Sequence, residues 1–204
     1  MTARLRTPGL VALALLTGCG PLVQIGGNAP VPQSLLTITA TAPPRNLDGP
    51  LRQQDTIGVE LPGVPATLQT LRIPVVTGTS EVVYLVGATW AEQPNRQFQR
   101  LLADTLTAGG IPVIDVRQSN LAPARRLTGS LREFGLDVRD PAQPVVRVRY
   151  DAQLTDPRAP QALLLRRFDA SEAAADQRPA AVAAALDRAA NRIAADVAGW
   201  AAGR

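Results

Sequence analysis

Hydrophobic and polar residues alternate most regularly in the second half of the chain. Over residues 145–155 every second residue is apolar or aromatic, and the residues between them are polar. This period of two is typical of an antiparallel strand with one face on the core and one in water. Residues 125–137 alternate more loosely, and Gly135 predicts a bulge there. We therefore expect two long strands, followed by a third over residues 162–168.

Two stretches repeat their apolar residues every three or four positions, as the buried face of a helix requires. The first covers residues 94–107, where Pro94 suits the first turn and the glycine pair after the stretch suits its end. The second covers roughly residues 179–201 and carries an Ala-rich apolar stripe that ends at Trp200. Each helix should pack this stripe against the sheet.

Shorter apolar or β-branched runs predict four further strands, at residues 34–40, 56–61, 81–89 and 111–116. Residues 71–76 are also extended, but Pro74 within them indicates an edge strand or no strand. The order of strands, helix, strands and helix predicts an α+β fold. We expect a mixed or mostly antiparallel sheet with two helices packed on one face.

The N-terminal segment has the pattern of an export signal. Arg4 and Arg6 precede an apolar run over residues 10–16. That run is too short to cross a bilayer, because a span needs roughly 20 apolar residues. It leads into the sequence LTGC, a lipobox that ends at Cys19. We predict that residues 1–18 are a lipoprotein signal peptide and that Cys19 receives diacylglycerol and palmitate.

The predicted domain organisation follows from this signal. Residues 19–33 comprise the lipidated cysteine and a Gly- and Pro-rich tether, and residues 34–204 form a single periplasmic domain. Residues 20–33 could reach at most about 50 Å when extended. Gly20, not Asp, follows the cysteine. By the usual bacterial sorting rule this favours a lipid anchor in the outer membrane over one in the inner membrane.

The composition removes most routes to catalysis. The chain has no His, and Cys19 is its only cysteine, which leaves no Ser–His or Cys–His dyad and no metal site built from Cys and His. No nucleotide-binding motif occurs. We expect no catalytic residues, no metal ligands and no cofactor. The acidic residues Asp137 and Asp140, beside Arg139, should be exposed and ion-paired; a carboxylate-dependent hydrolase is the enzymatic alternative.

The charges do not indicate a nucleic-acid partner. The formal charge is +4, all bases are Arg, and about +2 remains once Arg4 and Arg6 are removed. Charges of both signs are interspersed without a contiguous basic block, which argues against nucleic-acid binding. Aromatic residues make up only 3%. Tyr84, Trp90 and Trp200 either fill the core or contact a partner or a lipid.

Residues 82–116 resemble the ABC-type transport auxiliary lipoproteins, which include the paraquat-inducible C-type proteins. The family pattern is a strand with a tyrosine (Tyr84), a tryptophan before a helix (Trp90), and a helix rich in Arg, Gln, Phe and Leu (residues 98–102). Later segments are similar too: residues 127–138 and 145–155 as the central strands, Arg167 and Phe168 in a late strand, and the helix ending in Trp200. The resemblance covers most of the mature chain and is loosest at residues 34–76.

The resemblance implies a non-enzymatic accessory role. These lipoproteins are partners of MCE-domain lipid transporters. The implied partners are an MCE-domain protein with the ABC ATPase and permease of the same system, and the membrane through the lipid anchor. A homo-oligomer is left open. The alternative is an outer-membrane assembly lipoprotein that supports a β-barrel or a secretin, and neighbouring genes would separate the two.

The lipidation of Cys19 can be tested by Cys19→Ala. Without the acyl chains the protein should leave the membrane fraction, because two or more chains are what holds a lipoprotein stably. Membrane fractionation followed by immunoblotting measures this. Retention of the variant in membranes would contradict the anchor.

Overall fold

The computed structural model describes residues 34–115, 118–156 and 162–203. The predicted signal peptide, Cys19 and the tether lie outside the described residues. The helices and strands, with η for short 3-10 turns, are η1 (Gln53–Asp55), β1 (Ile57–Val59), η2 (Ala66–Leu68), β2 (Pro74–Val76), β3 (Val82–Tyr84), α1 (Pro94–Ala108), β4 (Arg125–Asp137), β5 (Val145–Thr155), β6 (Leu163–Ala173) and α2 (Pro179–Ala202).

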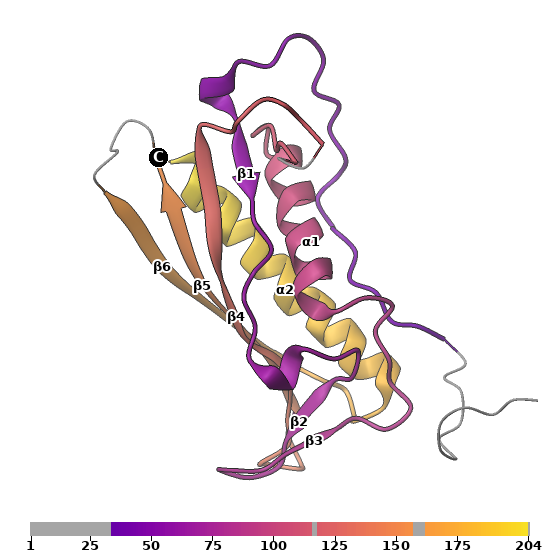
Figure 1. The fold of residues 1–204 in the computed structure, drawn as a ribbon. Coiled ribbons are helices and arrows are strands. Elements are labelled where there is room, and N and C mark those ends of the chain that lie inside the picture. The colour runs from indigo at the N-terminus through magenta and orange to yellow at the C-terminus, as the bar shows by residue number, and fades with distance from the viewer. Residues whose placement is uncertain (1–33, 116–117, 157–161, 204) are drawn as a thin grey trace, which may run out of the picture. The chain divides into compact units, whose positions relative to one another are not determined.

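Six strands form one open, mixed sheet in which β4, β5 and β6 are long neighbours (Figure 1). The strand order is β3-β2-β4-β5-β6, and the pairs β4–β5, β5–β6 and β2–β3 are antiparallel. β1 and β2 both pair with β4 in parallel, near opposite ends of that strand. The predicted α+β class with a mostly antiparallel sheet is confirmed.

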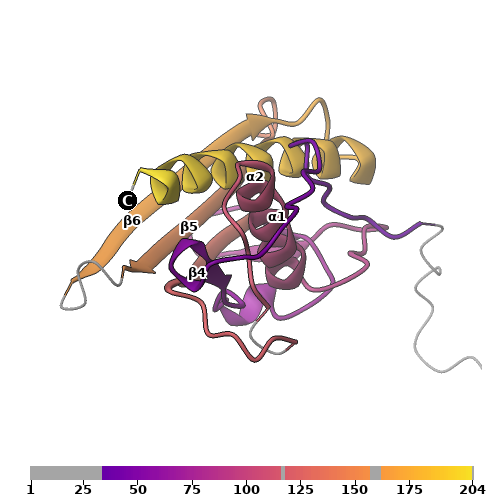
Figure 2. The same cartoon turned by 90° about the horizontal axis from the view of Figure 1, so that it is seen from above.

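Both helices pack on the same face of the sheet (Figure 2). Phe98 of α1 contacts Tyr150 of β5 with ring centroids 5.2 Å apart, and Trp200 of α2 contacts Phe168 of β6 at 5.7 Å. Tyr150 and Phe168 are direct cross-strand partners, and such partners point to the same side of a sheet. One face is therefore covered by helices, and the other face of β4–β6 is left open.

The alternation of β5 determines which face is buried. The apolar residues at its even-numbered positions are at most 2% exposed: Val146, Val148, Tyr150, Ala152 and Leu154. Gly129 of β4 pairs with Ala152 and lies diagonally across from Tyr150. A Cβ at Gly129 would lie 2.8 Å from the tyrosine ring and 2.3 Å from the Asp151 carbonyl oxygen. Glycine is therefore required for the close approach of β4 and β5.

The two predicted helices are confirmed to within one residue at each end. Pro94 and Pro179 begin them, where a missing N–H costs nothing. Gly109 and Gly110 end α1, and Gly110 has a φ of +85°, a conformation that glycine adopts without strain.

Two predicted strands are absent. Residues 34–40 form one isolated bridge, Leu36 to Trp90, and otherwise lie on the helices. The backbone N–H groups of Ile38, Thr39 and Thr41 donate to side chains of the helices, namely Gln97, Asp187 and Asn191. Residues 111–115 likewise form only the bridge of Val113 to Ile57, and Val116 lies outside the described residues.

Other strand boundaries differ from the expectation. β1 and β3 keep only three residues of the predicted 56–61 and 81–89, whereas β6 runs beyond the predicted 162–168 to Ala173. β2 lies between β3 and β4, so it is an internal strand and not an edge. Pro74 is tolerated there because it is the first residue of the strand, where its missing N–H interrupts no ladder.

The bulge in β4 lies elsewhere than predicted. The register shifts between Leu131 and Glu133, whereas Gly135 pairs regularly with Arg147. Gly135 serves packing: a Cβ there would lie 2.5 Å from the Pro74 carbonyl oxygen. The glycine therefore allows β2 to approach β4.

Trp90 is fully buried, with its ring centroid 5.6 Å from that of Phe134. Among the described residues its indole N–H has no hydrogen-bond acceptor. Trp90→Ala should therefore lower the free energy of unfolding by about 3–5 kcal/mol through the cavity it leaves. Trp90→Phe should cost less, since the lost N–H is unpaired. Denaturant unfolding measures both; a cost of Trp90→Ala no larger than that of Tyr84→Ala, at a half-buried position, would contradict this packing.

Candidate functional site

The open face of the sheet carries cross-strand ion pairs in rows. In one row Arg149 of β5 lies between Glu133 of β4 and Asp169 of β6, with nitrogen–oxygen distances of 2.6 and 2.5 Å. All three side chains are more than a third exposed. Water and salt screen such pairs, so they contribute little to stability. They leave this face charged but nearly balanced in sign.

A second row has the opposite order of charges. Asp151 of β5 accepts from Arg167 of β6 at 2.7 Å and from Arg132 of β4 at 3.2 Å. The two arginines lower the pKa of Asp151, chiefly through the hydrogen bond from Arg167. The alternation of β5 places these side chains on one face, but only the strand register shows which residues they meet.

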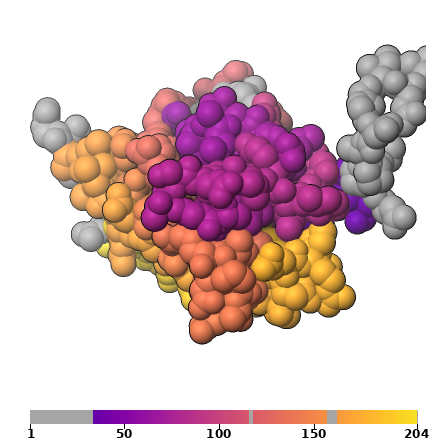
Figure 3. Space-filling model, turned by 90° about the horizontal axis from the view of Figure 1, so that it is seen from below, coloured from indigo at the N-terminus to yellow at the C-terminus, as the bar shows by residue number. Residues whose placement is uncertain are grey.

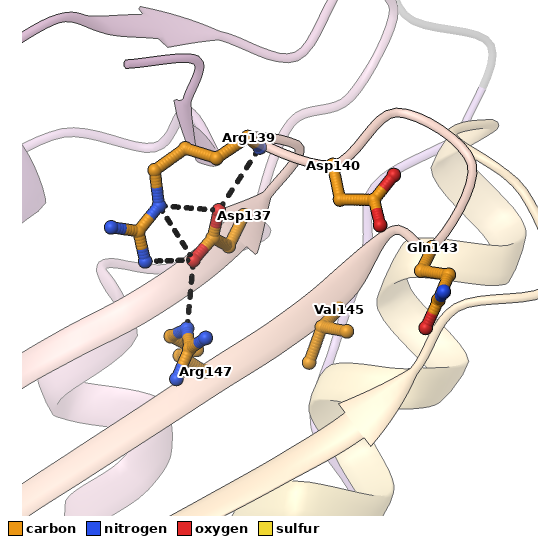
Figure 4. A pocket seen from close by; sticks show the side chains of 6 residues that line it. All are labelled: Asp137, Arg139, Asp140, Gln143, Val145 and Arg147. Atoms are coloured by element: carbon orange, nitrogen blue, oxygen red, sulfur yellow. Dashed lines mark hydrogen bonds and ion pairs between the residues drawn. The ribbon is translucent and has the colours of Figure 1, made fainter. Parts of the chain in front are cut away.

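Asp137, the last residue of β4, is the most strongly perturbed acid of the open face. It accepts from the Arg139 guanidinium at 2.6 Å, from the Arg139 backbone N–H at 3.1 Å, and from Arg147 Nε at 2.8 Å (Figure 4). The side-chain hydrogen bond from Arg139 lowers the pKa of Asp137 by more than burial raises it. The pKa therefore lies far below its ordinary value. The predicted ion pairing is present, but the predicted exposure of Asp137 is wrong, since the residue is 7% exposed.

The cluster of Asp137, Arg139 and Arg147 lines a shallow hollow of about 450 Å³, together with Asp140, Gln143 and Val145. Asp140 is exposed and accepts the backbone N–H of Ala142. A general acid or base needs a pKa near the working pH, and Asp137 is far from that condition. The arrangement instead ties the two ends of the β4–β5 turn together.

An apolar crevice of about 120 Å³ adjoins this hollow and shares Asp137 and Arg147 with it. It lies between the β2–β3 hairpin and β4, and its apolar lining comprises Leu68, Pro74, Val76, Val82, Phe134 and Leu136. Small-molecule sites typically occupy about 300–1,000 Å³. The crevice is therefore too small for a lipid and could take only a single side chain or a short alkyl segment.

A larger groove of about 730 Å³ lies along α1. Gln99 of α1 crosses it to donate to the Val59 carbonyl oxygen at 2.8 Å. Ion pairs of Arg100 with Glu92 and of Arg126 with Glu60 involve further lining residues. The hydrogen bond and the charge balance make the groove a polar seam between α1 and β1.

The three aromatic candidates do not form one site. Trp90 and Trp200 are 0% and 7% exposed and pack on Phe134 and Phe168. Tyr84 is half-buried on the edge strand β3, and the Arg72 guanidinium stacks 4.3 Å above its ring. Of the three, Tyr84 alone has the exposure that a surface contact needs.

The rows of cross-strand ion pairs on the open face were not predicted. Opposite charges at every second residue of adjacent long strands could have indicated them.

No three metal-ligating side chains cluster within residues 34–115, 118–156 and 162–203. In the same part of the chain no helix has both the length and the apolar character that a membrane crossing needs.

Comparison with known proteins gives a family match. Residues 36–198 match the family model described as ABC-type transport auxiliary lipoprotein component. No curated protein matches the chain.

Solved structures share the fold. The protein XCC0632 from Xanthomonas campestris, of family model DUF330, is 20% identical, with a TM-score of 0.70 over 82% of this chain and 94% of that chain. The crystal structure of an uncharacterized protein is 15% identical, with a TM-score of 0.62 over 82% and 99%. The PelC dodecamer from Paraburkholderia phytofirmans, at 22% identity over 75% and 93%, has a TM-score of only 0.38, which is too low to support an inference about assembly.

The Asp137 cluster predicts a pH-dependent stability difference. Asp137→Asn should cost roughly 1–3 kcal/mol at pH 7, because it removes a buried charged acceptor. Since folding lowers the pKa of Asp137, its contribution is complete above the ordinary Asp pKa of about 3.9. It is lost as the pH falls toward the lower folded-state value.

Urea unfolding of the wild type and of Asp137→Asn, from pH 7 down to pH 3, measures the difference. Asp140→Asn in the same turn is the matched control and should change stability little at any pH. A wild-type advantage over Asp137→Asn that grows as the pH falls would contradict the ion-pair account.

Proposed function

The chain belongs to the family of ABC-type transport auxiliary lipoprotein components, and from that premise we propose that it is the lipid-anchored periplasmic accessory of an MCE-type ABC transporter. The ATPase and permease are other chains of the same system. The cargo class is lipid or another hydrophobic substrate, moved across the cell envelope.

One observation carries this proposal: the family match spans residues 36–198, nearly the whole described domain, downstream of a lipobox that ends at Cys19. The two features belong to different parts of the chain and agree on a lipoprotein. Gly20 after the lipidated cysteine supports the outer membrane as the site of the anchor.

The geometry supports a binding role over a catalytic one. The carboxylate of Asp137 has a strongly lowered pKa and accepts from two arginines, so it is poorly suited to proton transfer. The open sheet face presents balanced ion pairs and, at one end of β6, the exposed side chains of Leu163 and Leu165. Exposed apolar residues rimmed by charges are typical of protein–protein contact.

Co-purification tests the proposal. The lipidated chain, captured from detergent-solubilised membranes, should bring down an MCE-domain protein together with its ATPase and permease, identified by mass spectrometry. Lipid should co-purify with this assembly. The Cys19→Ala chain is the control and should recover much less, because it no longer shares a membrane surface with its partners. Recovery of a β-barrel or a secretin in their place would contradict the proposal.

A further inference from the structure

A group of exposed apolar side chains lies beside the point where the chain enters the described domain. These side chains and the half-buried Tyr84, here called the entry patch, are Leu35, Leu71, Tyr84 and Val86. Leu35 and Leu71 are 57% and 40% exposed, and Val86 is 84% exposed. So many exposed apolar side chains in one region indicate an interaction surface.

Backbone hydrogen bonds bring the segments of the patch side by side. The Leu36 N–H donates to the Thr89 carbonyl oxygen at 2.8 Å, and the Trp90 N–H donates to that of Leu71 at 2.8 Å. The next segment is joined by the Leu85 N–H, which donates to the Ile73 carbonyl oxygen at 2.9 Å. Figure 3 views the molecule from below, where the purple and magenta segments form a broad surface and the described chain begins at its margin.

The chain outside the described residues limits what this surface can meet. Between Cys19 and Ser34 lie residues 20–33, rich in Gly and Pro. Even fully extended, 14 residues reach at most about 50 Å. A lipid on Cys19 would therefore keep the entry point near the bilayer and raise the effective concentration of lipid at the patch.

The chemistry of the patch fits the interfacial zone of a bilayer. Valine and leucine side chains supply apolar contact, and Tyr84 has an amphipathic ring of the kind enriched at membrane interfaces. The Arg72 guanidinium, stacked 4.3 Å above that ring, puts a positive charge at the same place. Arginine can reach phosphate while its stem remains on apolar surface.

We infer that the entry patch lies against the phospholipid surface that holds the anchor, with Val86 in the interfacial zone. This inference rests on the proposed function, because it needs the lipid on Cys19. The inference fixes the orientation of the domain. The patch faces the bilayer, and the end of the sheet where β5 ends and β6 begins points away from it. Leu163 lies at that far end, one β5 length or about 33 Å along the sheet from the β2 end.

The test uses the lipidated chain in vesicles of phosphatidylethanolamine and phosphatidylglycerol, without any partner protein. A cysteine introduced by Val86→Cys carries an environment-sensitive fluorophore, and Leu163→Cys is the matched control at another exposed apolar position. The Cys19 sulfur is blocked by the lipid, so only the introduced thiol reacts. At position 86 the emission of the probe should shift to the blue on binding to the vesicles, and a lipid-borne spin label should quench it. At position 163 neither change should occur.

A second measurement tests the patch as a unit. With the probe at Leu35→Cys, the added substitution Val86→Asp should reduce quenching, whereas Leu165→Asp, at a residue that is 67% exposed, should leave it unchanged. Both substituted side chains are exposed, so neither variant should impair folding.

The outcomes separate the inference from the proposed function. A probe at position 86 that stays unquenched, or equal quenching at positions 86 and 163, overturns the inference while the anchor stands. A parent chain without an added cysteine that takes up the fluorophore, or that fails to float with vesicles, shows that the anchor itself is absent. That result overturns both.

Discussion

The ring of Tyr150 fills the space that Gly129 leaves on β4, and Phe98 of α1 closes that space from the helix side. The Tyr150 hydroxyl donates to the Thr128 carbonyl oxygen at 3.0 Å, which satisfies its polar atom within the core. One side chain thus holds β4, β5 and α1 at fixed distances. Because Phe168 of β6 is its cross-strand partner and packs on Trp200 of α2, the same position also sets where the second helix lies.

This packing divides the sheet into two unlike faces. The inner face is closed by helices and carries the aromatic residues, while the outer face carries arginines and carboxylates that satisfy one another. Asp137 combines a property of each face: it is buried, yet it remains charged because it forms ion pairs with Arg139 and Arg147. Such a carboxylate stabilises the turn between β4 and β5 and leaves a charged surface at that end of the sheet.

The N-terminal segment connects this scaffold to the predicted anchor. Residues 34–41 hydrogen-bond to side chains of both helices, through Gln97 of α1 and Asp187 and Asn191 of α2. Asn191 also donates to the Thr39 carbonyl oxygen at 2.9 Å. The point where the chain enters the described domain is therefore fixed on the helix layer.

The sequence by itself determined the elements whose pattern is local. The period-two alternation of β5, the bounds of α1 and α2, and the α+β class all follow from periodicity and from the Pro and Gly residues at the helix ends, because each residue's environment repeats within a few positions. The tertiary structure alone decided what depends on distant neighbours. Residues 34–40 read as a strand, but they bond to side chains about 150 positions away, such as Asp187, and not to the sheet. Pro74 could be internal because β2 begins at that residue, and Asp137 became buried because Arg139 and Arg147 compensate its charge. Sequence patterns encode the face a residue presents, but not the partner that covers it.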